Sequence, residues 1–111
     1  MTMDAPADTL EQSLTRRLRE VLAGSAATEG ELRRLKEQAE GLARSLTAGI
    51  SSSEAQLTAL AAEPDAGVAE MAAELRRVER LREELDDLRA DLAALASRTR
   101  TLRGGWLRQT Y

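Results

Sequence analysis

The sequence predicts an all-α protein: a long antiparallel helical hairpin, or coiled coil, with a short N-terminal helix and no strands. Three observations support this fold class. Ala, Leu, Glu and Arg dominate the 111 residues, a composition typical of long helices. No segment combines period-two alternation with strand-forming residues. The seam positions from Leu81 to Leu102 recur at alternating steps of four and three, which is the heptad spacing of a coiled coil.

The first predicted element is a short amphipathic helix over residues 9–23, which follows a flexible N-terminus at 1–8. Thr9 and Gln12 have the spacing of a capping box, in which the two side chains satisfy free amide donors at a helix start. Leucines and a valine line one stripe behind this cap. We expect the helix to stop near Gly24, because glycine favours helix ends.

A helical hairpin is predicted over residues 28–103. Its first helix covers 29–62, and Thr28 with Glu31 has the spacing of a second capping box. The Gly- and Ser-rich stretch at 49–53 is a weak point that either bends or interrupts this helix. The apolar stripe continues at Ile50 and beyond, which favours one long helix.

The hairpin turn is placed at residues 63–65. Pro64 disfavours helical geometry in the residue before it, and Asp65 is expected to cap the next helix, over 66–103. The two helices are similar in length, so a tight turn between them predicts an antiparallel pair. Two glycines are expected to end the second helix and to leave residues 104–111 as an aromatic and basic C-terminal tail.

The leucine seam of the second helix is the predicted partner interface. Burying a Leu contributes about 1.5–3 kcal/mol and an Ala much less, so a Leu/Ala hairpin without aromatic residues in its body is marginal alone. We therefore expect self-association or a protein partner. The predicted interface residues are Leu75, Val78, Leu81, Leu85, Leu88, Leu92, Leu95 and Leu102.

The charged residues beside the seam have two interpretations. Glu79 and Arg82, like Arg80 and Glu84, have the spacing of neighbouring side chains on one helix, which is typical of a solvated face. The other interpretation is that charges flanking the seam select a partner helix.

The C-terminal tail is the second candidate site. It contains the only Trp and Tyr of the chain together with arginines, and Arg and aromatic residues are enriched at interface hot spots. Docking on a partner is the first interpretation, a cap over the open end of the hairpin the second, and nucleic-acid binding the third. The expected docking residues are Arg103, Trp106, Leu107, Arg108 and Tyr111.

The composition argues against catalysis. Without Cys or His the chain has no disulfide, thiol or imidazole chemistry, and we expect no metal, cofactor or small-molecule substrate. The N-terminus lacks the apolar core of a secretory signal, and the apolar runs are too short to span a membrane. A cytoplasmic location is expected, with export by a signal-less system left open.

The predicted function is therefore that of a non-enzymatic coiled-coil interaction protein, a structural or adaptor subunit of a larger assembly. The run from Leu85 to Leu102, followed by a basic tail with a Tyr, resembles helical flagellar or type III export chaperones. That resemblance implies an alternative, a small chaperone that holds an amphipathic client helix. A second alternative is a nucleic-acid accessory protein that uses the arginine-rich tail.

Overall fold

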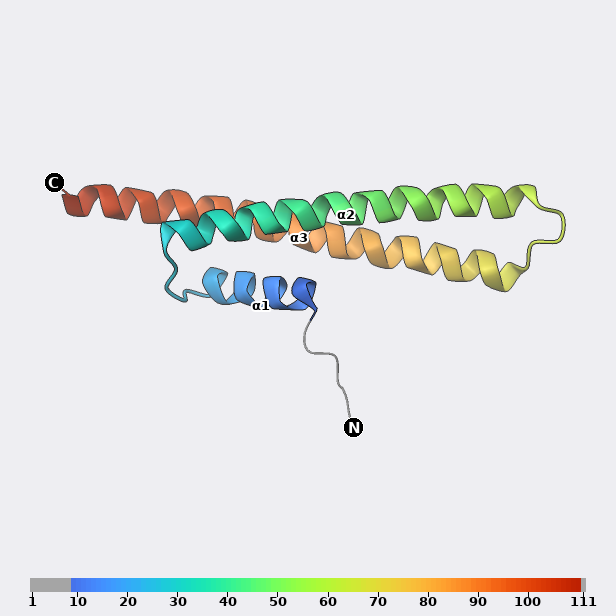
Figure 1. Cartoon of the computed structure of the whole chain (residues 1–111), viewed down its shortest axis with the longest axis horizontal. Coiled ribbons are helices and arrows are strands. Elements are labelled where there is room, and N and C mark those ends of the chain that lie inside the picture. Colours follow the sequence, from blue (N-terminus) through green and yellow to red (C-terminus); the bar gives the residue numbers. More distant parts are fainter. Residues whose placement is uncertain (1–8, 111) are drawn as a thin grey trace, which may run out of the picture. The chain divides into compact units, whose positions relative to one another are not determined.

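The computed structural model describes the backbone of residues 9–110 and the side chains of residues 9–105 and 107. This part of the chain forms three α-helices and no strand: α1 (Leu10–Leu22), α2 (Glu29–Ala62) and α3 (Val68–Thr110). α2 and α3 run antiparallel on either side of a short turn (Figure 1). The predicted fold class, an all-α helical hairpin with a short N-terminal helix, is confirmed.

The described residues group into two compact units. Residues Ala43–Arg89 form the hairpin unit, which contains the second half of α2, the turn and the first half of α3. The three-helix unit combines α1, the part of α2 up to Leu42 and the part of α3 from Ala90.

The boundaries of α1 follow from two local motifs. The Thr9 hydroxyl accepts a hydrogen bond from the Gln12 amide at 3.1 Å, and the Gln12 side chain accepts one from the Thr9 amide at 3.1 Å, so the predicted capping box is confirmed. At the other end Gly24 has a φ of +113°, which a residue with a side chain rarely adopts. The Gly24 amide donates to Val21 and the Ser25 amide to Glu20, which is the hydrogen-bond pattern of a Schellman motif.

The stretch at 49–53 does not interrupt α2, which is one helix from end to end. One side of this stretch packs against the rest of the hairpin unit. A Cβ atom added to Gly49 would lie 3.5 Å from the Leu81 side chain, within ordinary van der Waals contact. Ile50 is buried, and Ser53 is a buried polar residue with 3% of its surface exposed. Gly49, Ile50 and Ser53 therefore lie on the inner face of α2 within the hairpin unit, whereas Ser51 and Ser52 are exposed.

The hairpin turn is longer than predicted. The Ala66 amide donates to the Glu63 carbonyl at 3.3 Å, so residue 66 belongs to the turn. The Gly67 carbonyl accepts from the Met71 amide at 3.2 Å, and α3 begins at Val68. The predicted start at residue 66 with Asp65 as cap is wrong by two residues, because this turn uses the Ala66 amide.

The predicted end of the second helix at two glycines is also wrong. α3 continues through Gly104 and Gly105 to Thr110, and among the described glycines only Gly24 has positive φ. A glycine in a helix costs about 1 kcal/mol relative to alanine but keeps its amide donor, so it weakens a helix without ending it. Residues 104–110 are thus helical, and Tyr111 lies outside the described residues.

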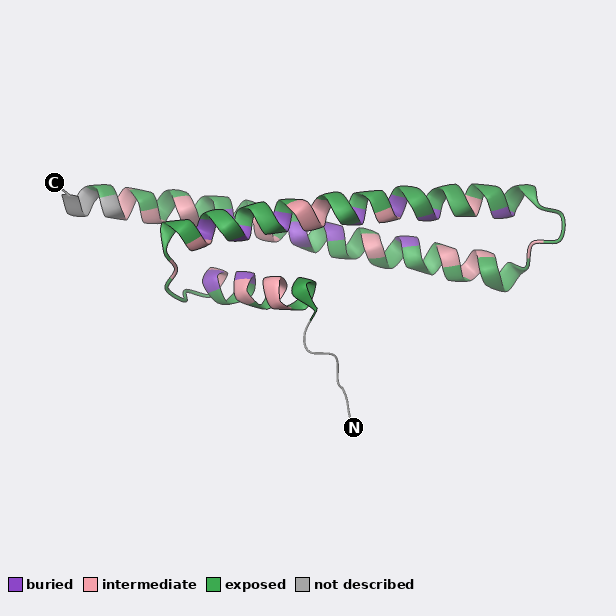
Figure 2. Ribbon diagram, viewed as in Figure 1, coloured by how far each residue is buried: buried purple, intermediate pink, exposed green. Residues whose placement is uncertain are grey.

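Each unit has its own apolar core, visible as the buried positions in Figure 2. The core of the hairpin unit consists of Leu46, Ile50, Leu60, Val78, Leu85 and Leu88. The core of the three-helix unit consists of Leu18, Val21, Leu32, Leu35, Ala39 and Leu95. Both cores are built almost entirely from aliphatic side chains at helical spacing.

Candidate interaction site

The predicted partner seam lies mainly in the chain's own cores. Four of its members are buried: Val78, Leu85, Leu88 and Leu95. Three more are half-buried: Leu81, Leu92 and Leu102. Only Leu75, with 49% of its surface exposed, remains open. In this structure most of the seam packs within the chain's own cores, and a partner interface along it stays a prediction.

Large apolar side chains are exposed at other positions. Val68 is 82% exposed, and it lies seven residues before Leu75 on the same helix. A separation of seven residues places two side chains on one helix face. In the three-helix unit Leu10 and Leu107 are exposed as well, with 62% of the Leu107 surface accessible. Single exposed apolar side chains are common on protein surfaces, so the face shared by Val68 and Leu75 is the candidate for contact with another molecule.

Part of the predicted docking tail is engaged within the three-helix unit. The Arg103 guanidinium donates to the Glu29 carboxylate at 3.1 Å, so this arginine joins the C-terminal part of α3 to the start of α2. Leu107 is exposed, as docking requires. The side chains of Trp106 and Arg108, and the whole of Tyr111, lie outside the described part of the structure.

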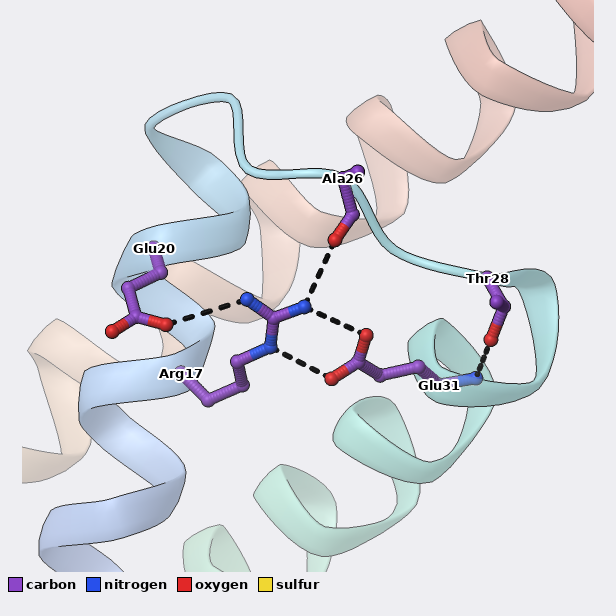
Figure 3. Close-up of polar contacts among 5 residues, drawn as sticks. All are labelled: Arg17, Glu20, Ala26, Thr28 and Glu31. Carbon is purple, nitrogen blue, oxygen red and sulfur yellow. Dashed lines mark hydrogen bonds and ion pairs between the residues drawn. The ribbon is translucent and has the colours of Figure 1, made fainter.

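The strongest polar site in the described structure is one that the sequence did not reveal. Arg17 on α1 donates two parallel hydrogen bonds to the Glu31 carboxylate on α2, Nε to Oε2 at 2.7 Å and Nη2 to Oε1 at 2.8 Å (Figure 3). The Nη2 atom also donates to the Ala26 carbonyl at 2.9 Å, and Nη1 lies 3.3 Å from the Glu20 carboxylate. One guanidinium thus holds both helices and the loop between them.

Partial burial strengthens this ion pair. The Arg17 and Glu31 side chains are 32% and 28% exposed. The hydrogen bonds from Arg17 hold the pKa of Glu31 below its ordinary value. The same bonds to Glu31 raise the pKa of Arg17 above its ordinary value. A bidentate pair of this kind fixes orientation as well as distance, so it sets how α1 lies on α2.

The expected second capping box is only half formed. The Thr28 hydroxyl accepts from the Glu31 amide at 3.0 Å, but the Glu31 side chain is bound to Arg17 (Figure 3). A guanidinium offers the carboxylate two charge-assisted hydrogen bonds, where the backbone amide of a cap offers one neutral donor. The spacing of Thr28 and Glu31 predicted a role for Glu31 within the helix cap, so its contact with Arg17 on α1 was not predicted.

The charged residues at neighbouring positions on α3 are exposed, as on a solvated face, and the described ion pairs do not join them to one another. Arg82 pairs instead with Glu54 of α2, within the hairpin unit. None of the ion pairs between described residues joins two residues of α3. The long arginine side chain reaches the neighbouring helix, which a spacing rule for one helix does not consider.

The described residues contain no group of three or more acidic, His or Cys residues that could hold a metal ion. In the three-helix unit the Arg98 Nε is buried and has no hydrogen-bond partner among the described atoms.

None of the described helices combines the length and the apolar character that crossing a membrane requires.

Comparison of the chain with protein-family models, with curated proteins and with solved structures gives no match. The function proposed below therefore rests on the residues and their geometry.

Proposed function

We propose that this chain is a non-enzymatic helical interaction protein, a structural or adaptor subunit of a larger protein assembly. One observation carries the proposal: most of the leucine seam is packed within the chain's own cores, but the side chains of Val68, Leu75 and Leu107 are exposed to solvent. A helical scaffold with exposed apolar side chains and no candidate metal centre in its described part fits protein binding better than chemistry.

The thin cores support the same proposal. They are built from Leu, Ile, Val and Ala side chains. A buried Leu contributes about 1.5–3 kcal/mol, against about 1–2 kcal/mol of backbone entropy for every ordered residue. A long hairpin with so small a core gains from any partner that covers its exposed apolar side chains.

The two alternatives receive less support. A chaperone for an amphipathic helix needs an open apolar stripe, but Val78, Leu85 and Leu88 are buried in the hairpin unit. The alternative of a nucleic-acid accessory relies on the C-terminal arginines, of which Arg103 pairs with Glu29, Arg98 is half-buried and Arg100 is exposed. Both alternatives make predictions that differ from those of an interaction subunit, namely binding of one exported client or steeply salt-dependent binding of nucleic acid.

Site-specific photo-crosslinking tests the proposal. A photoreactive residue replaces Leu75 or Leu107 in the full chain, and the control position is Gln56, which is exposed on α2. We expect the two apolar positions to capture one defined protein and Gln56 to capture none. Leu75→Ser should then weaken binding of that protein when it is purified. Equal labelling at all three positions would argue against a protein-binding surface.

A further inference from the structure

A charged stripe on α3 lies opposite the core of the hairpin unit. It consists of Arg76, Arg80, Glu83 and Asp87, which follow one another at steps of four, three and four. This spacing keeps all four residues on one helix face. All four are exposed.

The position of this stripe follows from the buried residues beside it. Arg76 and Arg80 lie two positions before and after the buried Val78. Glu83 and Asp87 lie two positions before and after the buried Leu85. Two residues correspond to about 200° around a helix, so the stripe points away from the core and into solvent.

The charges on the stripe are not used within the chain. Among the described residues, neither the two arginines nor the two acids of the stripe form an ion pair. They are also grouped by sign, with Arg76 one turn from Arg80 and Glu83 one turn from Asp87. Like charges one turn apart repel each other, and Arg80 with Glu83 is the one pair of opposite neighbours within the stripe.

The order of the charges does suit a second copy of the same helix. If two copies of α3 pair antiparallel about a twofold axis between positions 81 and 82, position 76 of one copy faces 87 of the other, and 80 faces 83. Every facing pair then joins an arginine to a carboxylate, and symmetry repeats both pairs. A twofold interface requires such self-complementarity. Ala73 continues the stripe with a small side chain that does not hold two helices apart.

We propose that two copies of this chain associate antiparallel through the stripe Arg76, Arg80, Glu83 and Asp87. The inference rests on the proposed function, because it names a second copy of the chain as one partner of the interaction subunit. Because exposed ion pairs supply most of the attraction, the dimer is weak and dissociates as the ionic strength rises.

Charge exchange in the full chain tests this pairing. The acidic variant carries Arg76→Glu and Arg80→Glu, and the basic variant carries Glu83→Arg and Asp87→Arg. Each variant replaces four attractive contacts between copies by four repulsive ones. In sedimentation at low salt we expect the dimer dissociation constant of each to rise at least about tenfold. An equimolar mixture should form a heterodimer, and the variant with all four changes should self-associate like the wild type.

The matched control is Arg33→Glu with Arg44→Glu. It changes the net charge of the wild type by the same amount as the acidic variant does, but at exposed positions of α2 outside the stripe. Its dissociation constant should stay near that of the wild type, and circular dichroism should show equal helix content in every variant. A wild type that stays monomeric at low salt overturns the pairing, as does a mixture that forms no heterodimer. Crosslinking of a different protein from position 75 would in those cases leave the proposed function intact.

Discussion

Arg17 and Glu31 lie 14 residues apart and join α1 to α2 through two parallel hydrogen bonds of 2.7 and 2.8 Å. The same guanidinium binds the Ala26 carbonyl in the intervening loop. α1 is thus held by one polar side chain as well as by the buried Leu18 and Val21.

Replacing the guanidinium should loosen α1. Arg17→Lys keeps the positive charge but cannot make two parallel bonds to Glu31 and a third to Ala26. We expect a lower melting temperature and faster amide exchange within Leu10–Leu22, measured by hydrogen exchange with mass spectrometry. Glu20→Gln is the control, because Glu20 has only the 3.3 Å contact with Arg17. Unchanged exchange in the Arg17→Lys variant would show that apolar packing alone holds α1.

Acid should weaken the same contact. The folded protein lowers the pKa of Glu31 through its hydrogen bonds with Arg17, so the folded state favours the ionised carboxylate. The resulting stability is fully present above the ordinary Glu pKa of about 4.3 and is lost as the pH falls through the lowered pKa. Arg17 stays protonated throughout this range. Glu31→Gln should flatten the acid side of a melting-temperature profile relative to the wild type.

The buried leucines should dominate the stability of the hairpin unit. Leu88→Ala removes a side chain that is 5% exposed and should cost about 2–5 kcal/mol in free energy of unfolding. Leu75→Ala, at a position that is 49% exposed, should cost about 1 kcal/mol or less. Urea denaturation followed by circular dichroism measures both. Equal losses would mean that Leu75 is covered in solution.

Replacement of two different glycines by alanine should change the stability of the protein in opposite directions. Gly105 lies in a helix with open space where a Cβ would stand, so Gly105→Ala should stabilise α3 by about 0.5–1 kcal/mol. Gly24 has a φ of +113°, so Gly24→Ala should destabilise the end of α1 by about 1 kcal/mol. Thermal melts of the two variants give the comparison, and a loss of stability on Gly105→Ala would count against a continuous α3.

Helix formation was predictable from the sequence because its causes are local. The composition, the capping box of Thr9 and the glycine stop at Gly24 all act within a few residues. The errors arose where two local signals competed. Asp65 is a good helix cap, but the turn uses the Ala66 amide, and the glycines at 104 and 105 weaken α3 without ending it.

The candidate site was harder to predict because it depends on contacts between helices. Heptad spacing identifies Val78, Leu85 and Leu88 as apolar seam positions, but it does not say whether the neighbouring helix belongs to the same chain. The contact between Arg17 and Glu31 left no signal in the sequence, since the spacing of Thr28 and Glu31 had a local explanation. Exposure of Val68 and Leu75 likewise becomes visible only after the helices are packed.

The ion pairs between helices close chain segments of very different lengths, and this difference bears on the order of folding. The contact of Arg17 with Glu31 spans 14 residues, that of Arg82 with Glu54 spans 28, and that of Arg103 with Glu29 spans 74. Closing the longest segment directly costs about 1.5 kcal/mol more entropy than closing the shortest. That entropic cost is smaller once the turn has formed and the two helices pack progressively from the turn toward their far ends. We therefore expect the turn and the α1 junction to nucleate folding, with the contact between Glu29 and Arg103 formed last.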